Sequence, residues 1–135
     1  TLARMSAPTD RGGFLDIVLD FVVYAAMPLA FAVVDPAGNA LAACVLLASF
    51  LVNGIALMAF ALMSERRKSA AKPSGDKSFL FLAGLAEGTE TIAAFSLFCL
   101  FPAAFASLAF AFAAVCFVSA AARLVLGWRL LGDGK

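Results

Sequence analysis

Four long apolar stretches, separated by short polar segments, dominate the pattern of the chain. They run from about residue 13 to 34, 40 to 63, 78 to 101 and 103 to 131. Each is long enough to cross a hydrocarbon core of about 30 Å as a helix rising about 1.5 Å per residue. None alternates like a membrane β-strand, and a helix satisfies its own backbone hydrogen bonds in lipid. The pattern predicts an all-α, polytopic membrane helix bundle with four transmembrane helices.

The polar segments between these stretches predict a single bundle. Residues 35–39 have the composition of a tight turn, and Pro102 marks a second turn that can open the last helix. Residues 1–12 and 64–77 are polar and basic. With no further boundary, we expect residues 1–135 to form one membrane domain.

Composition and charge agree with this class and suggest an orientation. The chain is 64% hydrophobic and only 14% charged, whereas a soluble domain is about a quarter charged. Its net charge of +1 argues against nucleic acid as a partner. All ten Lys and Arg lie in the first segment, the 64–77 loop or the end of the last stretch. The positive-inside rule therefore predicts that both termini and the basic loop are cytoplasmic.

The basic loop has two interpretations. Its cations can bind a phosphorylated substrate, or they can simply set topology and attract anionic lipid. We favour the second interpretation. The residues concerned are Arg66, Arg67, Lys68, Lys72 and Lys77.

Four carboxylates fall inside the predicted spans, where charge is costly and calls for a function. Asp16 and Asp20 are four residues apart and share one helix face, as do Glu87 and Glu90, three apart. The chain has no histidine, so a hard, oxygen-preferring cation such as Mg²⁺ or Mn²⁺ is the natural partner. By depth, the two pairs can meet in one cavity that opens to the cytoplasm.

Each pair also has a structural alternative. Asp16 alone can be solvated in the interfacial zone at the start of its helix. The glutamate pair can instead form hydrogen bonds that join neighbouring helices, with Thr89, Thr91 or Asn53 as partners. These alternatives stay open at this point.

The segment around the aspartates carries a specific motif. Ala3-Arg4 is followed by seven residues, then Gly12, three residues, Asp16, three residues and Asp20. This resembles the second half of the CDP-alcohol phosphotransferase signature, Asp-x-x-Asp-Gly-x-x-Ala-Arg, about eight residues, then Gly-x-x-x-Asp-x-x-x-Asp. The motif match is confined to residues 1–20.

The resemblance implies a longer protein. The first half of the signature, with its two aspartates, would lie directly before Thr1. The family has six spans, so two would precede the four counted here. The chain would then be the C-terminal portion, and we expect it to be inactive by itself.

The resemblance also implies an activity. The family transfers a substituted phosphate (phosphatidyl) group from a CDP-alcohol, usually CDP-diacylglycerol, to an alcohol acceptor and releases CMP, a step of phospholipid biosynthesis. Its four aspartates hold divalent metal. Asp16 and Asp20 would be metal ligands, with Asp20 also the general base, and Ala3, Arg4 and Gly12 would bind the nucleotide.

Further expectations concern the acceptor, the assembly and the location. Phe21 stands where many members carry Lys, which leaves the acceptor alcohol open. The stretch 85–91 is similar to one in some bacterial members, so Glu87, Thr89 and Glu90 are expected to line a substrate pocket. Members are commonly homodimers. We expect a location in the bacterial inner (plasma) membrane.

A transporter is the main alternative function. Small multidrug resistance transporters have four spans and an essential membrane glutamate, a role open here to Glu87 or Glu90. Their glutamate lies in the first span rather than the third, and that function leaves the motif around Asp16 and Asp20 unused. A structural anchor subunit would leave all four acids unexplained. The sequence therefore favours the phosphotransferase.

Overall fold

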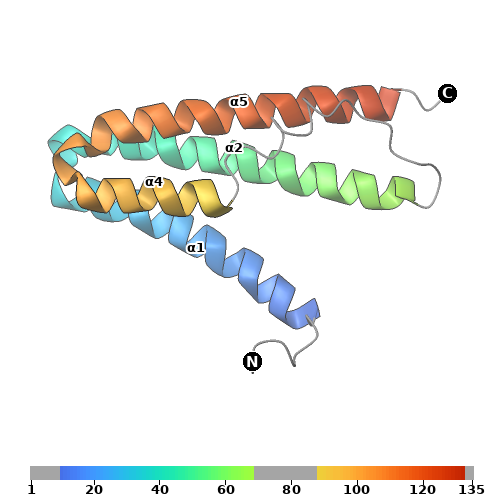
Figure 1. The fold of residues 1–135 in the computed structure, drawn as a ribbon, viewed down its shortest axis with the longest axis horizontal. Helices are drawn as coiled ribbons and strands as arrows, with labels where there is room; N and C mark the ends of the chain where they lie inside the picture. Colours follow the sequence, from blue (N-terminus) through green and yellow to red (C-terminus); the bar gives the residue numbers. More distant parts are fainter. Residues whose placement is uncertain (1–9, 69–87, 133–135) are drawn as a thin grey trace.

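A computed structural model describes residues 10–68 and 88–132, and these two ranges contain helices and no strand (Figure 1). The all-α prediction is confirmed for this part of the chain. Two turns lie at one end of the bundle, so α1 and α4 run toward that end while α2 and α5 run away from it (Figure 1). The elements are α1 (Asp10–Val34), α2 (Pro36–Lys68), α4 (Gly88–Leu100), the 3₁₀ turn η2 (Pro102–Ala104) and α5 (Phe105–Gly132).

Three of the described helical segments are long and apolar enough to cross a membrane. They are Arg11–Val34, Pro36–Met63 and Pro102–Arg129. The chain is therefore an α-helical membrane protein. The described part of α4 has 13 residues, and residues 78–87 of the predicted third span lie outside the described residues. Four spans thus remain a prediction.

The first turn is tighter than expected. We predicted that residues 35–39 form the turn, but α2 begins directly at Pro36. Proline is favoured at a first helical position because its missing N–H needs no partner there. Asp35 caps the helix, since its Oδ1 accepts a hydrogen bond from the Gly38 N–H at 3.1 Å.

Other boundaries also extend beyond the apolar stretches. Helix α2 continues through residues 64–68, so the predicted loop 64–77 is wrong over this part. Glu, Arg and Lys are good helix formers, and cations are favoured at a helix C-terminus. At the other end of the chain, α1 already begins at Asp10, which makes Gly12 helical. After Pro102, one 3₁₀ turn precedes α5.

Helices α2 and α5 lie side by side along small, buried side chains (Figure 1). Small residues let two backbones approach closely, which is how membrane helices gain packing energy without a hydrophobic effect between them. Apart from the adjacent pair Ala42 and Ala43, these side chains recur every three to four residues on each helix, on one face. They are Ala42, Ala43, Leu46 and Ser49 on α2 and Ala109, Ala113, Cys116 and Ala120 on α5, none more than 2% exposed.

An aromatic cluster joins the other helices to this pair near the turns. The ring of Phe31 in α1 stacks on that of Phe105 in α5, with 4.2 Å between centroids. Phe98 in α4 meets Phe105 edge to face at 5.2 Å. Toward its N-terminus α1 diverges from α2 and α5 (Figure 1), and residues 11–20 are all exposed. The predicted carboxylate site lies on this diverging half.

Candidate functional site

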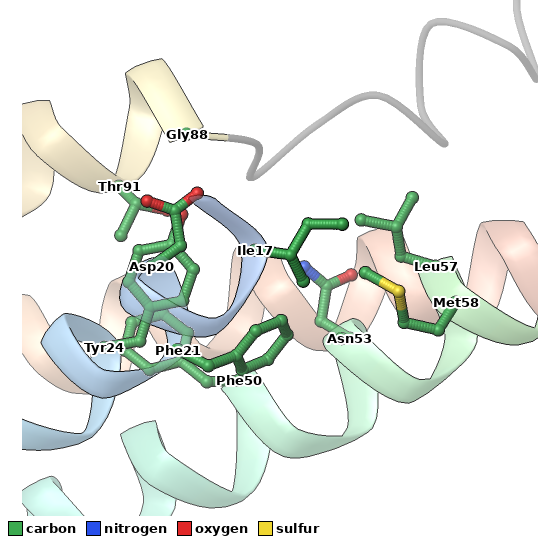
Figure 2. Close-up of a pocket in the computed structure, with 11 residues that line it drawn as sticks. Ile17, Asp20, Phe21, Tyr24, Phe50, Asn53, Leu57, Met58, Gly88 and Thr91 are labelled. Carbon is green, nitrogen blue, oxygen red and sulfur yellow. The ribbon is translucent and has the colours of Figure 1, made fainter. Parts of the chain in front are cut away.

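A pocket of about 320 Å³ opens where α1 diverges from α2, beside the first turn of α4 (Figure 2). Three helices contribute to its wall. The lining residues are Ile17, Asp20, Phe21 and Tyr24 from α1, Phe50, Asn53, Gly54, Leu57 and Met58 from α2, and Gly88 and Thr91 from α4.

Asp20 is the carboxylate that lines this pocket, among the residues the structure describes. Its side chain lies on the same side of the pocket as Thr91 (Figure 2). Asp16 lies one turn earlier on the same face of α1 and is exposed. Counted from the Arg11 end of the span, Asp16 and Asp20 lie at depths of about 8 and 14 Å. A carboxylate at the depth of Asp20 is costly in lipid.

Tyr24 continues the row of polar side chains one turn beyond Asp20. Its side chain is hydrogen-bonded to that of Thr91. Its ring packs against Phe50 and Phe95, with centroids at 5.4 and 6.0 Å. The phenol is thus held between α1 and α4 at the inner end of the pocket. The sequence analysis missed it, although the spacing of four residues from Asp20 was a usable signal.

Asn53 and Arg123 form a buried polar contact behind the pocket. The Arg123 Nη1 donates a hydrogen bond to the Asn53 Oδ1 at 2.5 Å, which joins α5 to α2. The two side chains are 3% and 7% exposed, respectively. The positive-inside argument used only the position of Arg123 in the last part of its stretch, and the structure adds that its side chain is buried in the bundle. It lies inside the bundle because the face of α5 that carries it packs on α2.

The rest of the pocket wall is apolar. Phe50, Leu57 and Met58 on α2 face Ile17 and Phe21 on α1. A ligand with both an apolar part and a polar, oxygen-rich part matches a wall of this composition. This combination is the one a membrane lipid headgroup with its first acyl carbons presents.

The structure brings only some of the predicted site residues together. Gly12 is in the first turn of α1 and does not line the pocket. Thr89 and Glu90 are exposed in α4 and do not line it either, whereas their neighbours Gly88 and Thr91 do. Ala3, Arg4 and Glu87 lie outside the described residues.

Two carboxylates on one helix face fit part of a divalent cation site. Asp16 and Asp20 offer the oxygen ligands that Mg²⁺ and Mn²⁺ prefer. Residues 10–68 and 88–132 hold no group of three or more His, Cys, Asp or Glu that could bind a metal ion. The described residues would therefore supply no more than these two carboxylates to such a site, and further ligands would have to come from elsewhere.

A close contact between α1 and α2 sets the shape of the pocket and is testable. A Cβ atom added at Gly54 would overlap the ring of Phe21, whereas one added at Gly127 would lie 3.7 Å from Phe60, an ordinary contact. Both substitutions with alanine gain about 1 kcal/mol of helix propensity. We expect Gly54→Ala to be less stable than Gly127→Ala by about 1–3 kcal/mol, because the ring must move.

Thermal unfolding of the two variants in detergent measures this difference. Equal melting temperatures would show that the Phe21 ring is not confined between the two helices.

Comparison with known proteins supports the membrane class. The chain is 45% identical over 130 residues to "Inner membrane protein YnjF" of Escherichia coli (strain K12). The match covers 96% of this chain and 63% of the relative, so the chain spans less than two thirds of that protein. No protein-family model matches the chain. No solved structure matches it.

Proposed function

We propose that the chain is part of a CDP-alcohol phosphotransferase of the bacterial inner membrane. The enzyme transfers a phosphatidyl group from a donor such as CDP-diacylglycerol to an alcohol and releases CMP. The motif that ends in Asp16 and Asp20 supports this activity. The similarity to a protein named for the inner membrane supports the location.

The observation that carries the proposal is the position of Asp20. A carboxylate about 14 Å into a span is costly unless it has a function. Here it faces a pocket whose wall is partly apolar. A lipid-linked phosphate can enter such a pocket sideways from the bilayer while its polar group reaches the carboxylate. This explains why a phosphotransfer site would be built on a membrane helix.

The two aspartates have separate roles in this mechanism. Asp16 and Asp20 would each provide carboxylate oxygen to a divalent cation. When bound, that cation neutralises negative charge on the phosphate oxygens and on the departing CMP. Asp20 also accepts the proton of the acceptor hydroxyl. The hydroxyl oxygen then forms a bond to the phosphorus atom of the phosphatidyl group as the bond between that phosphorus and the CMP oxygen breaks.

The nucleotide end of the donor would lie toward the start of α1. Ala3, Arg4 and Gly12 are the residues that the motif assigns to it. Gly12 lies two turns before Asp20 on α1, at the shallow end of the span. A polar nucleotide would therefore stay near the membrane surface while the lipid part lies deeper.

The transporter alternative has less support. Glu90 is exposed and does not line the pocket, and Asp16 and Asp20 would have no part in it. Proton-coupled uptake by protein-containing vesicles that depends on Glu87 or Glu90 would favour this alternative instead.

Metal removal tests the proposed activity directly. The full-length protein that contains these residues should release CMP from CDP-diacylglycerol when an alcohol acceptor and Mg²⁺ or Mn²⁺ are present. EDTA should abolish the release and added Mg²⁺ should restore it, because the cation offsets the repulsion between the carboxylates and the phosphates. Residues 1–135 alone should release none.

A panel of acceptors is needed, including glycerol phosphate, inositol phosphate and serine. The proposal is wrong if no acceptor supports CMP release, or if EDTA leaves the rate unchanged. It is equally wrong if the residues encoded before Thr1 are not Asp-x-x-Asp-Gly.

A further inference from the structure

The Tyr24 hydroxyl belongs to a further part of the same site, and this inference rests on the proposed function. We propose that Tyr24 binds the hydroxyl group of the acceptor alcohol at the inner end of the pocket, beside the Asp20 carboxylate. Thr91 is the positioning residue, because its side chain is hydrogen-bonded to the phenol and orients it. Asp20 then takes the proton of a hydroxyl that Tyr24 holds in place.

The polar side chains of the pocket come together on its α4 side. Asp20 and Tyr24 are one turn apart on the same face of α1, and both line the pocket with Thr91. Figure 2 shows the Asp20 carboxylate on the same side of the pocket as Thr91, the hydrogen-bond partner of Tyr24. A Cβ atom added at Gly88 in α4 would lie 4.0 Å from the phenol oxygen. The carboxylate and the phenol can therefore contact the same small ligand group.

The hydrogen-bonding capacity of a phenol fits an alcohol. A phenol hydroxyl donates one hydrogen bond and can also accept, and its bond with Thr91 uses only one of these functions. If Thr91 donates in this bond, the Tyr24 O–H can donate to a ligand oxygen. If Tyr24 donates, its oxygen can still accept. An alcohol hydroxyl both donates and accepts, so it matches Tyr24 in either case.

The depth and surroundings of Tyr24 indicate which part of the acceptor it binds. Counted from the Arg11 end, Tyr24 lies about 20 Å into the span, where a charged group is costly. Its ring packs against Phe50 and Phe95, so the surroundings of the phenol are largely aromatic. The neutral, hydroxyl-bearing end of the acceptor therefore enters first, and any charged group of the acceptor stays toward the shallow end.

A purely structural role, in which Tyr24 only joins α1 to α4, makes a different prediction. Tyr24→Phe and Thr91→Val break the same hydrogen bond from opposite sides, and each variant nearly keeps the shape of the side chain. Tyr24→Phe removes the group that holds the acceptor, whereas Thr91→Val removes only the partner that orients this group. If the bond only joins the two helices, both variants should change stability and activity equally.

The expected results for the full-length protein differ between the two substrates. Tyr24→Phe should raise the KM for the acceptor by about 5- to 10-fold, the loss typical of one hydrogen bond, and leave the KM for CDP-diacylglycerol unchanged. Thr91→Val should raise the acceptor KM by a smaller factor, although both variants unfold at similar temperatures. Ser96→Ala removes an exposed hydroxyl of α4 that is bonded to the Ile92 carbonyl. It is the control and should leave both KM values unchanged.

A binding measurement makes the inference independent of turnover. Isothermal titration calorimetry of the Mg²⁺-loaded protein with glycerol phosphate, inositol phosphate and serine should show an acceptor that binds Tyr24→Phe more weakly than the wild type or Ser96→Ala. If the wild type releases no CMP yet shows this pattern, the alcohol site stands and the proposed activity fails. If no acceptor binds and none supports CMP release, both fail.

Other outcomes overturn the inference while the activity stands. An active wild type whose acceptor KM is unchanged in Tyr24→Phe would do so. The same holds if Tyr24→Phe and Thr91→Val raise the KM values of both substrates equally, because the bond is then only a link between helices. Should Tyr24→Phe not fold, an unchanged acceptor KM in Thr91→Val alone overturns the inference.

Discussion

Replacing Asp20 with asparagine is expected to lower CMP release by the full-length enzyme by about 10³- to 10⁴-fold. Loss of a general base alone typically costs about 10²- to 10⁴-fold, and Asp20 is assigned a second role as a metal ligand. The amide has the size of the carboxylate but neither accepts a proton nor carries charge. Because Asp20 is exposed on α1, the substitution should leave the unfolding temperature nearly unchanged. Initial rates at saturating Mg²⁺ and thermal unfolding in detergent measure the two effects.

Asp35→Asn is the matched control. It makes the same chemical change on an exposed aspartate at the opposite end of the bundle. Asparagine caps a helix about as well as aspartate, so the hydrogen bond to Gly38 and the start of α2 should survive. This variant should keep wild-type activity. If Asp20→Asn retained more than a tenth of the wild-type rate, Asp20 would not be the base.

The sequence predicted the elements of the fold that depend on local pattern. The apolar stretches gave the helices, because length and hydropathy alone decide whether a segment can cross lipid. Their ends were less well predicted. Asp35 shortens the first turn by capping α2 at once, and residues 64–68 stay helical although they are polar. Hydropathy does not report helix propensity or capping, so it places a boundary where polarity changes rather than where the helix ends.

The candidate site was likewise predicted where it depends on residues close in sequence, and missed where it depends on residues far apart in sequence. The shared face of Asp16 and Asp20 followed from their spacing, and the structure places Asp20 at a pocket. The partner of Arg123 did not follow from any local pattern, because Asn53 lies 70 residues earlier in the chain. Only the packing of α5 on α2 brings them together. Hydropathy counts an arginine near the end of a span as an interfacial anchor, whichever way its side chain points.

The aromatic cluster near the turns should be the main support for the position of α1. Phe105→Ala is expected to lower the free energy of unfolding by about 3 kcal/mol, because the side chain is fully buried and the remaining cavity loses its packing contacts. Phe110→Ala, on the lipid-exposed side of the same helix, should cost far less, since lipid chains fill the space. Denaturant or thermal unfolding in detergent measures both.

Phe105→Ala should also lower activity, although Phe105 does not line the pocket. Phe105 holds Phe31 of α1 by ring stacking, while the half of α1 that carries Asp20 already diverges from α2 (Figure 1). Without this anchor, α1 can pivot and carry Asp20 away from Asn53. CMP release should therefore fall in Phe105→Ala even at temperatures where the protein is folded, and should be unaffected in Phe110→Ala. Full activity in folded Phe105→Ala would show that the N-terminal half of α1 is held by contacts other than this cluster.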